Sequence, residues 1–140
     1  MEANQDLIEA RTALEEANEA LKKVTRAQIS EIKSLISCPL KLTLLLEYIF
    51  KLTGEDVEGW VPVKNALRSN PQLLAQLASL DPAQVDQKAL DWVTAKITKD
   101  GEDWSPEALD RISTAGGKLN RWMLAFCKLS NLEKAAAKTN

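Results

Sequence analysis

The first part of the chain carries an apolar residue at every third or fourth position, with charged residues filling most of the positions between them. This spacing is the heptad pattern of a coiled-coil helix. A helix of this length cannot bury its apolar side alone, so the pattern predicts an arm that needs a partner helix. The predicted seam consists of Leu7, Ala10, Leu14, Ala17, Leu21 and Val24.

The middle of the chain predicts a series of short helices, because strand signals are scarce and the prolines fall where helices would begin. Thr25 and Gln28 have the spacing of a capping box, which predicts a helix that runs to about Ile36. Pro39 opens the most apolar helix, and Gly54 ends it. Further helices are expected at 59–70, from the Asn-Pro pair at 70–71, and after the Asp-Pro pair at 81–82 through 85–97.

The last segment predicts one long helix that begins at the Ser-Pro-Glu sequence of 105–107, contains Gly116 and Gly117, and runs to about Ala137. Such a helix projects beyond a small domain and can pair antiparallel with the first arm. Two seams are possible on it, and either the pairing register is weakly specified or one seam is the flank of a wide apolar face. The first seam is Ala125, Leu129, Leu132 and Ala136, and the second is Trp122, Phe126 and Leu129.

The expected fold is therefore all-α, with a small six-helix globular bundle at the tip of an antiparallel two-helix coiled coil. Residues 1–24 form the first arm in this prediction, 25–122 the helical domain, and 123–140 the returning arm, continuous with the last helix. A length of 140 residues with 45% hydrophobic content fits one compact domain.

Composition removes several classes of function. Lys and Arg total 18 against 20 Asp and Glu, which gives a net charge of −2 and argues against a nucleic-acid-coating protein. The chain has no His, and Cys38 lies far from Cys127 in the sequence, so a zinc site is not expected and both cysteines are predicted to be free, buried thiols. No apolar stretch approaches the roughly 18 residues of a membrane span, and the polar start does not resemble a signal peptide. We expect an intracellular piece without a membrane contact.

No catalytic constellation is present in the sequence. There is no Gly-rich phosphate loop and no G-x-S-x-G turn. Lys118 follows the glycine pair at 116–117, but the phosphate-loop pattern is missing, and close packing or a bend of a helix explains the pair better. Carboxylate pairs such as Glu15 and Glu16 fit a solvated coiled-coil surface. We therefore expect no catalytic residue, no metal site, no cofactor and no enzyme activity in this chain.

The remaining candidate chemistry is cationic. Basic residues lie on three predicted helices, each opposite an apolar stripe. One such pair is explained by a solvated helix face alone. If the three helices meet at the tip, however, they present one basic patch on an otherwise acidic chain. The candidate residues are Arg26 and Lys33, Lys64 and Arg68, and Arg111, Lys118 and Arg121.

Several local sequences resemble the stalk head of dynein heavy chains, from about Glu19 to Leu129. The segment 23–35 (KVTRAQISEIKSL) is similar to the first-helix segment of that family, although Cys38-Pro39 stands where the family has two prolines. The sequence NPQLL at 70–74 resembles the family's N/D-P-x-F-L turn. WSPE at 104–107 and KLNRW at 118–122 resemble the start and the middle of its sixth helix.

The resemblance implies a head that binds the groove between α- and β-tubulin on a microtubule. The residues implied to contact tubulin are Arg26, Lys33, Lys64, Arg68, Arg111 and Arg121, whereas Lys118 fits the basic stripe but matches the family less clearly. It also implies that sliding of the two arms relays the nucleotide state of the ATPase in the rest of the heavy chain. The expected location is the cytoskeleton, and the axoneme of a cilium is favoured over the general cytoplasm. An axonemal dynein light chain is an optional partner. A helical adaptor that docks another protein is the alternative function.

Overall fold

The computed structural model describes residues 2–139, and within this range it contains seven α-helices and no strand. The expected all-α fold is confirmed. None of these helices combines the length and the apolar character needed to cross a lipid bilayer. In chain order they are α1 (Glu2–Lys22), α2 (Arg26–Lys33), α3 (Leu40–Thr53), α4 (Trp60–Ser69), α5 (Leu73–Ser79), α6 (Gln87–Ile97) and α7 (Thr114–Thr139).

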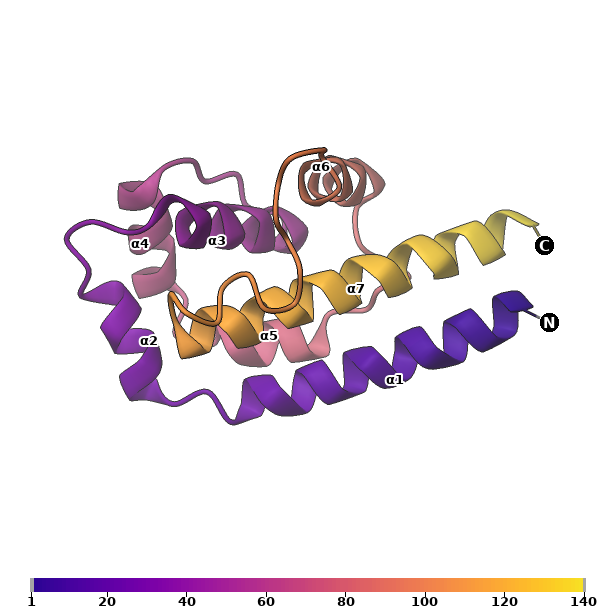
Figure 1. The fold of residues 1–140 in the computed structure, drawn as a ribbon, viewed down its shortest axis with the longest axis horizontal. Helices are drawn as coiled ribbons and strands as arrows, with labels where there is room; N and C mark the ends of the chain where they lie inside the picture. The colour runs from indigo at the N-terminus through magenta and orange to yellow at the C-terminus, as the bar shows by residue number, and fades with distance from the viewer. Residues whose placement is uncertain (1, 140) are drawn as a thin grey trace.

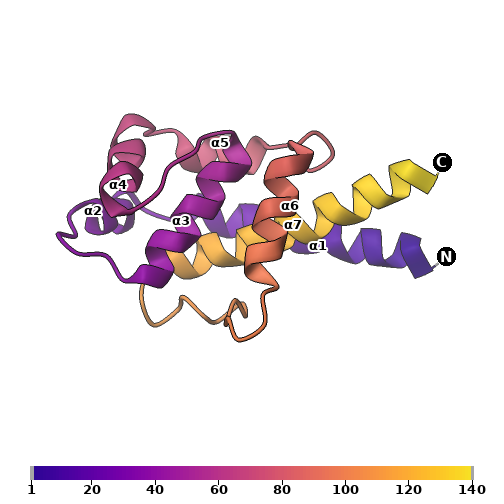
Figure 2. The same cartoon turned by 90° about the horizontal axis from the view of Figure 1, so that it is seen from above.

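The first and last helices lie side by side and antiparallel, and their free ends point to the same end of the molecule (Figures 1 and 2). Polar side-chain contacts join them at two points along their length. Arg11 Nε lies 3.3 Å from Glu133 Oε1, and Trp122 Nε1 donates to Asn18 Oδ1 at 3.0 Å. The helices α2, α3 and α6 also contact α7, so α7 belongs both to the pair of arms and to the helical head.

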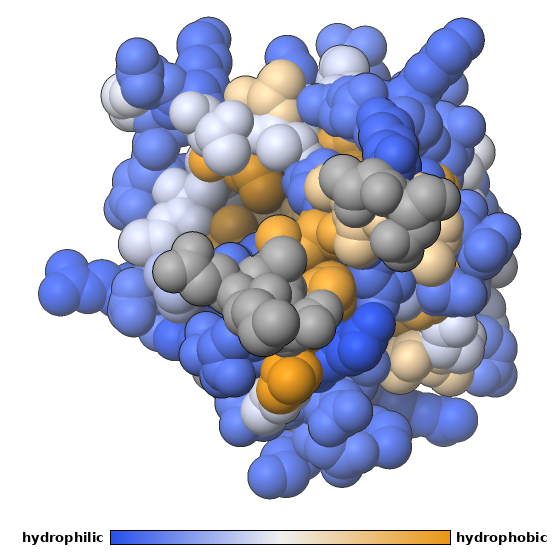
Figure 3. Space-filling view, turned by 90° about the vertical axis from the view of Figure 1, so that its right-hand side faces the viewer, coloured by the Kyte–Doolittle hydropathy of each residue, from blue (hydrophilic) through white to orange (hydrophobic). Residues whose placement is uncertain are grey.

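The α1 seam is buried at Ala10, Leu14, Ala17 and Leu21 and half-buried at Leu7. On α7, Trp122, Phe126 and Leu129 are buried, whereas Ala125 and Leu132 are half-buried. The helix α7 contacts α3 and α6 as well as α1. In this structure the two possible seams are thus parts of one wide apolar face. Viewed from the end where the arms finish, apolar side chains gather in the middle and hydrophilic ones surround them (Figure 3).

The centre of the head is α3, the most apolar helix, whose residues Leu45, Leu46, Ile49 and Phe50 have no exposed surface. Its ends are those that the sequence predicts. Pro39 occupies the N-cap position, and Gly54 ends the helix in the left-handed conformation with φ of 97°, which glycine adopts without steric cost. The fixed ends place the apolar side of α3 between α4, α6 and α7.

The predicted start of the last helix was wrong. Residues 106–112 form successive turns, and α7 begins only at Thr114. Two features favour the turns over a helix: Leu109 is completely buried in the core, and the Ser113 hydroxyl accepts a hydrogen bond from Gly116 N at 3.0 Å. The hydroxyl satisfies a donor that the first turn of a helix leaves unpaired. Arg111 therefore does not lie on the basic stripe of α7.

Three other boundaries differ from the predictions. The helix α2 ends at Lys33, and Ile36, expected on its inner side, is 95% exposed. The helix α5 begins at Leu73, after a turn that includes the Asn-Pro pair. The helix α6 begins at Gln87, because the Asp86 carboxylate caps it by accepting from Ala89 N at 3.0 Å.

Candidate functional site: the basic tip

The helices α2 and α4 and the start of α7 lie at the end of the molecule opposite the free ends of the arms (Figure 1). Here α2 contacts both α4 and α7. We use the name basic tip for the seven cationic residues on and near these helices. They are Arg26, Lys33, Lys64, Arg68, Arg111, Lys118 and Arg121, and their side chains differ in how free they are.

The position of α2 depends on its N-terminal cap. Thr25 Oγ1 accepts from Gln28 N at 3.1 Å, and Gln28 Oε1 accepts from Thr25 N at the same distance, so the predicted capping box is present. The box places Arg26 in the first turn and Lys33 in the last. Arg26 is exposed and Lys33 half-buried, and no ion pair in the described residues uses either cation.

The α2–α3 connection is held by α4. Trp60 Nε1 and Lys64 Nζ both donate to the Leu35 carbonyl oxygen, each at 3.2 Å. The Lys64 amine was expected on an outer face, but it is half-buried and already has this partner. Arg68, one turn further along α4, is exposed and forms no ion pair within residues 5–138.

On α7 the guanidinium of Arg121 is engaged by a carboxylate. It donates to both oxygens of Asp110, at 2.6 and 2.8 Å. This hydrogen bonding lowers the pKa of Asp110 below its usual value and raises the pKa of Arg121. A Cβ atom added at Gly117 would overlap the Asp110 carboxylate, so glycine leaves the room that this pair occupies. Close packing, one of the two explanations for the glycine pair, is thus what the structure shows at Gly117.

Arg111 and Lys118 take no part in that ion pair. Arg111 is exposed on the turns before α7, where it lines a shallow surface cavity of about 260 Å³ together with Gln28 and Glu31 of α2. Lys118 is half-buried on the second turn of α7. The structure therefore does not arrange the last three residues as one helical stripe, and Arg121 lines a surface cavity together with Ala13 and Ala17 of α1, on the side of the arms.

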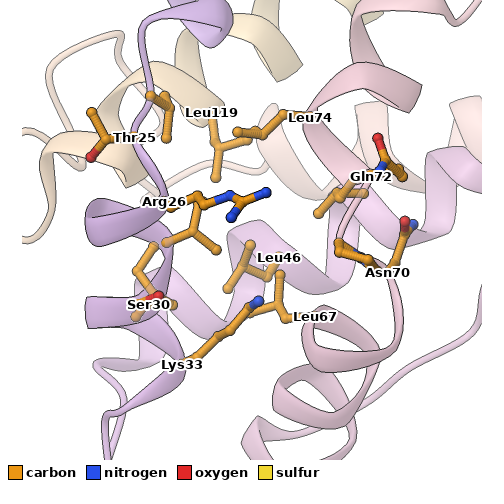
Figure 4. Close-up of a pocket in the computed structure, with 15 residues that line it drawn as sticks. Thr25, Arg26, Ser30, Lys33, Leu46, Leu67, Asn70, Gln72, Leu74 and Leu119 are labelled. Atoms are coloured by element: carbon orange, nitrogen blue, oxygen red, sulfur yellow. The ribbon is translucent and has the colours of Figure 1, made fainter.

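A second cavity lies beneath α2, and the sequence pattern gave no signal for it. It has a volume of about 260 Å³. Leu46 of α3, Leu67 of α4 and Leu119 of α7 contribute to its apolar wall. Arg26 and Lys33 extend toward it from α2 (Figure 4). We call this space the α2 cavity. It exists because α2, α3, α4, α5 and α7 converge without filling the space between them.

The remaining candidate chemistry is sparse. No group of three or more His, Cys, Asp or Glu side chains that could hold a metal ion is present in the described part of the chain. Burial raises the pKa of the Cys127 thiol to about 12. Burial also raises the pKa of Cys38, which is only half-buried, so the expectation of two buried thiols was wrong for that residue.

Comparison with known proteins reveals relatives along most of the chain. It is 29% identical over 124 residues to dynein axonemal heavy chain 2 of Homo sapiens, which covers 89% of this chain and 3% of that protein. It is 26% identical over 121 residues to a cytoplasmic dynein heavy chain of Caenorhabditis elegans, which covers 86% of this chain and 3% of that protein. The chain thus spans about 3% of the length of these relatives. No protein-family model matches the sequence.

A solved structure, the microtubule-binding domain of dynein-C, has the same fold. The TM-score is 0.75 at 22% sequence identity, and the match covers 99% of this chain and 96% of that one. Sequence and fold thus agree with the resemblance that the local motifs predict: the chain is similar to a short segment of dynein heavy chains and folds like the microtubule-binding domain of dynein-C.

Proposed function

We propose that this chain is the microtubule-binding head of a dynein heavy chain, together with part of the stalk that joins it to the motor. The observation that carries the proposal is the match to the microtubule-binding domain of dynein-C over 99% of the chain. Its partners would be α- and β-tubulin and the rest of the heavy chain. The chain itself would be a binding module, with the ATPase elsewhere in the motor.

The basic tip supplies the chemistry of this interaction, because the tubulin surface is acidic. Arg26, Arg68 and Arg111 are exposed and free of ion pairs in the described residues, so they are the members most ready to meet a carboxylate. Exposed charge pairs contribute little individually, about 0.2–1 kcal/mol each, and salt screens them. Several weak contacts give fast, reversible association, which suits a motor that must release its track.

The proposal is tested by co-sedimentation with microtubules at two ionic strengths. Binding should weaken as salt rises, and the double variant Arg68→Glu/Arg111→Glu should bind about tenfold more weakly, a change that requires about 1.4 kcal/mol. The control is Lys88→Glu/Lys99→Glu, which makes the same change in net charge at exposed positions outside the basic tip. Binding that ignores salt, or an equal loss in both double variants, would refute the proposal.

We further propose that the register of the arms controls affinity. The helix α7 supports this, because it runs without a break from the tip to the free end of the arms and carries both candidate seams. A slide of α7 along α1 would move Lys118 and Arg121 relative to α2. Two variants can be made in which a disulfide fixes the arms in registers that differ by half a heptad. Their microtubule affinities should differ, and equal affinities would exclude register control.

The relatives include both axonemal and cytoplasmic heavy chains, so a cytoskeletal location is the part of the localisation that they support. We propose the ciliary axoneme as the finer location, with an axonemal light chain as an optional partner of the head. Immunolocalisation to cilia tests the first point, and co-purification of a light chain with the full heavy chain tests the second. The alternative of a helical adaptor would be favoured if the chain fails to pellet with microtubules yet captures another protein.

A further inference from the structure

The α2 cavity has a chemical character that simple charge attraction does not explain. Its wall is largely apolar, with Leu46, Leu67 and Leu119 brought together from three helices. Leu74 of α5 closes another side and is itself only half-buried. A contact made by surface charges alone would leave this apolar space unused.

The charged groups around the cavity all have one sign. Of the residues that line it, only Arg26 and Lys33 are ionisable, and both are cations. Figure 4 shows both side chains reaching from α2 over the apolar wall. Neither takes part in an ion pair within residues 5–138. The cavity is therefore complementary to a guest that is apolar in the middle and negatively charged at its edges.

The size of the space indicates what kind of guest it accepts. Sites that enclose drug-sized molecules have volumes of roughly 300–1,000 Å³. The α2 cavity, at about 260 Å³, is below that range and suits one large side chain presented by a macromolecule. It lies beside α2, at the end of the head that carries the basic tip.

We infer that the α2 cavity receives one large apolar side chain of an acidic protein segment, while carboxylates on either side of that residue pair with Arg26 and Lys33. These cations are seven residues apart on one helix, which corresponds to about 10.5 Å along its axis. In an extended segment only side chains at even spacings share a face, so the matching carboxylates lie two residues before and two residues after the apolar residue, about 13 Å apart, within reach of the long Arg26 and Lys33 side chains. This inference rests on the proposed function in one respect, because it takes the acidic segment to come from the tubulin surface.

The chemistry is tested first without microtubules, using the fluorescence anisotropy of a labelled peptide, Gly-Glu-Ser-Phe-Ser-Glu-Gly, mixed with the whole chain in low salt. The peptide should bind, and replacing its Phe by Ala or both Glu by Gln should each weaken binding about tenfold. Methyl signals of Leu46, Leu67 and Leu119 should shift in NMR spectra on addition of the parent peptide only. No binding at millimolar peptide, or equal binding of the Phe→Ala peptide, would overturn the inference.

Two variants locate the guest. Leu74→Trp fills the cavity without changing charge and should abolish the advantage of the Phe peptide. Ala75→Trp is the matched control, because Ala75 is the exposed neighbour on α5 and does not line the cavity. Arg26→Gln/Lys33→Gln leaves the apolar wall intact and should abolish the advantage of the carboxylates, so the test stands even if Leu74→Trp fails to fold. Equal effects of Leu74→Trp and Ala75→Trp would count against the cavity.

Microtubule co-sedimentation of the same variants separates this inference from the proposed function. Leu74→Trp should lower microtubule affinity about tenfold, whereas Ala75→Trp should leave it unchanged. Salt-sensitive binding of the parent chain with no loss in Leu74→Trp would keep the proposed function and overturn the inference. If the parent chain does not pellet with microtubules at all, the proposed function fails, and so does tubulin as the source of the acidic segment. The peptide measurements alone then decide whether the α2 cavity binds an apolar side chain flanked by carboxylates.

Discussion

The helices α2 and α7 both contribute to the basic tip, but they are held in very different ways. On α7, Trp122 and Phe126 have no exposed surface and stack with ring centroids 4.8 Å apart. On α2, Ile32 is the only buried residue, and the helix lies over a cavity. Since local stability follows the number of buried contacts, α7 is the rigid reference of the head and α2 its loosely held binding element.

The largest expected difference between α7 and α2 is in the unfolding free energy that is lost when a side chain is truncated. Trp122→Ala should lower the free energy of unfolding by about 3–5 kcal/mol, because it leaves a large cavity and removes the hydrogen bond to Asn18. Ile29→Ala on α2 should cost about 1 kcal/mol, since Ile29 is only half-buried. Urea unfolding followed by circular dichroism measures both. Equal losses would show that α2 is packed as firmly as α7.

A second difference concerns ionisation in the interior of α7. Burial raises the pKa of Cys127 to about 12, whereas an unfolded thiol has a pKa of about 8.5. Between these values the unfolded chain loses a proton that the folded chain retains, so stability should fall as pH rises, by about 1.4 kcal/mol per pH unit. Below about pH 8.5 the thiol is neutral in both states and contributes no pH dependence.

The measurement compares the parent chain with Cys127→Ala, because the pKa of Tyr48 is also raised by burial and adds to any alkaline loss. The difference in unfolding free energy between the two proteins should change between pH 8.5 and 10.5 and stay constant from pH 6 to 8. A difference that does not change with pH would mean that α7 lets water reach Cys127.

The smallest expected effect is on α2 itself. Thr25→Ala removes one half of the capping box and should cost about 1 kcal/mol. Because α2 is weakly held, we expect faster hydrogen exchange of its amides with little change in those of α7, as measured by NMR. Thr12→Ala on exposed α1 is a suitable control, since the Thr12 hydroxyl bonds within its own helix and caps nothing. Uniformly faster exchange across the head would show that the two helices unfold together.

Features that depend on nearby residues could be predicted from the sequence. The capping box at Thr25 and Gln28, the ends of α3 and the heptad seam of α1 all depend on residues within a few turns of each other. The start of α7 could not be predicted, because burial of Leu109 in the core overrides a local helix signal.

The candidate site shows the same division. The identities of the basic residues could be read from their spacing, and the structure brings α2 into contact with α4 and α7. Their availability could not be read, because Asp110 is eleven positions from Arg121 and the Leu35 carbonyl is twenty-nine from Lys64. The α2 cavity was equally invisible, since its walls come from segments that only the fold brings together.

The side-by-side arrangement of the two free ends, with Arg11 against Glu133 near them, also has a use in protein engineering. A domain whose ends emerge together can replace a surface loop of a host protein without stretching the host. The head could be fused to the end of an unrelated antiparallel coiled coil in place of its hairpin loop. The host would then set the distance between the two attachment points and their relative position along the coiled-coil axis.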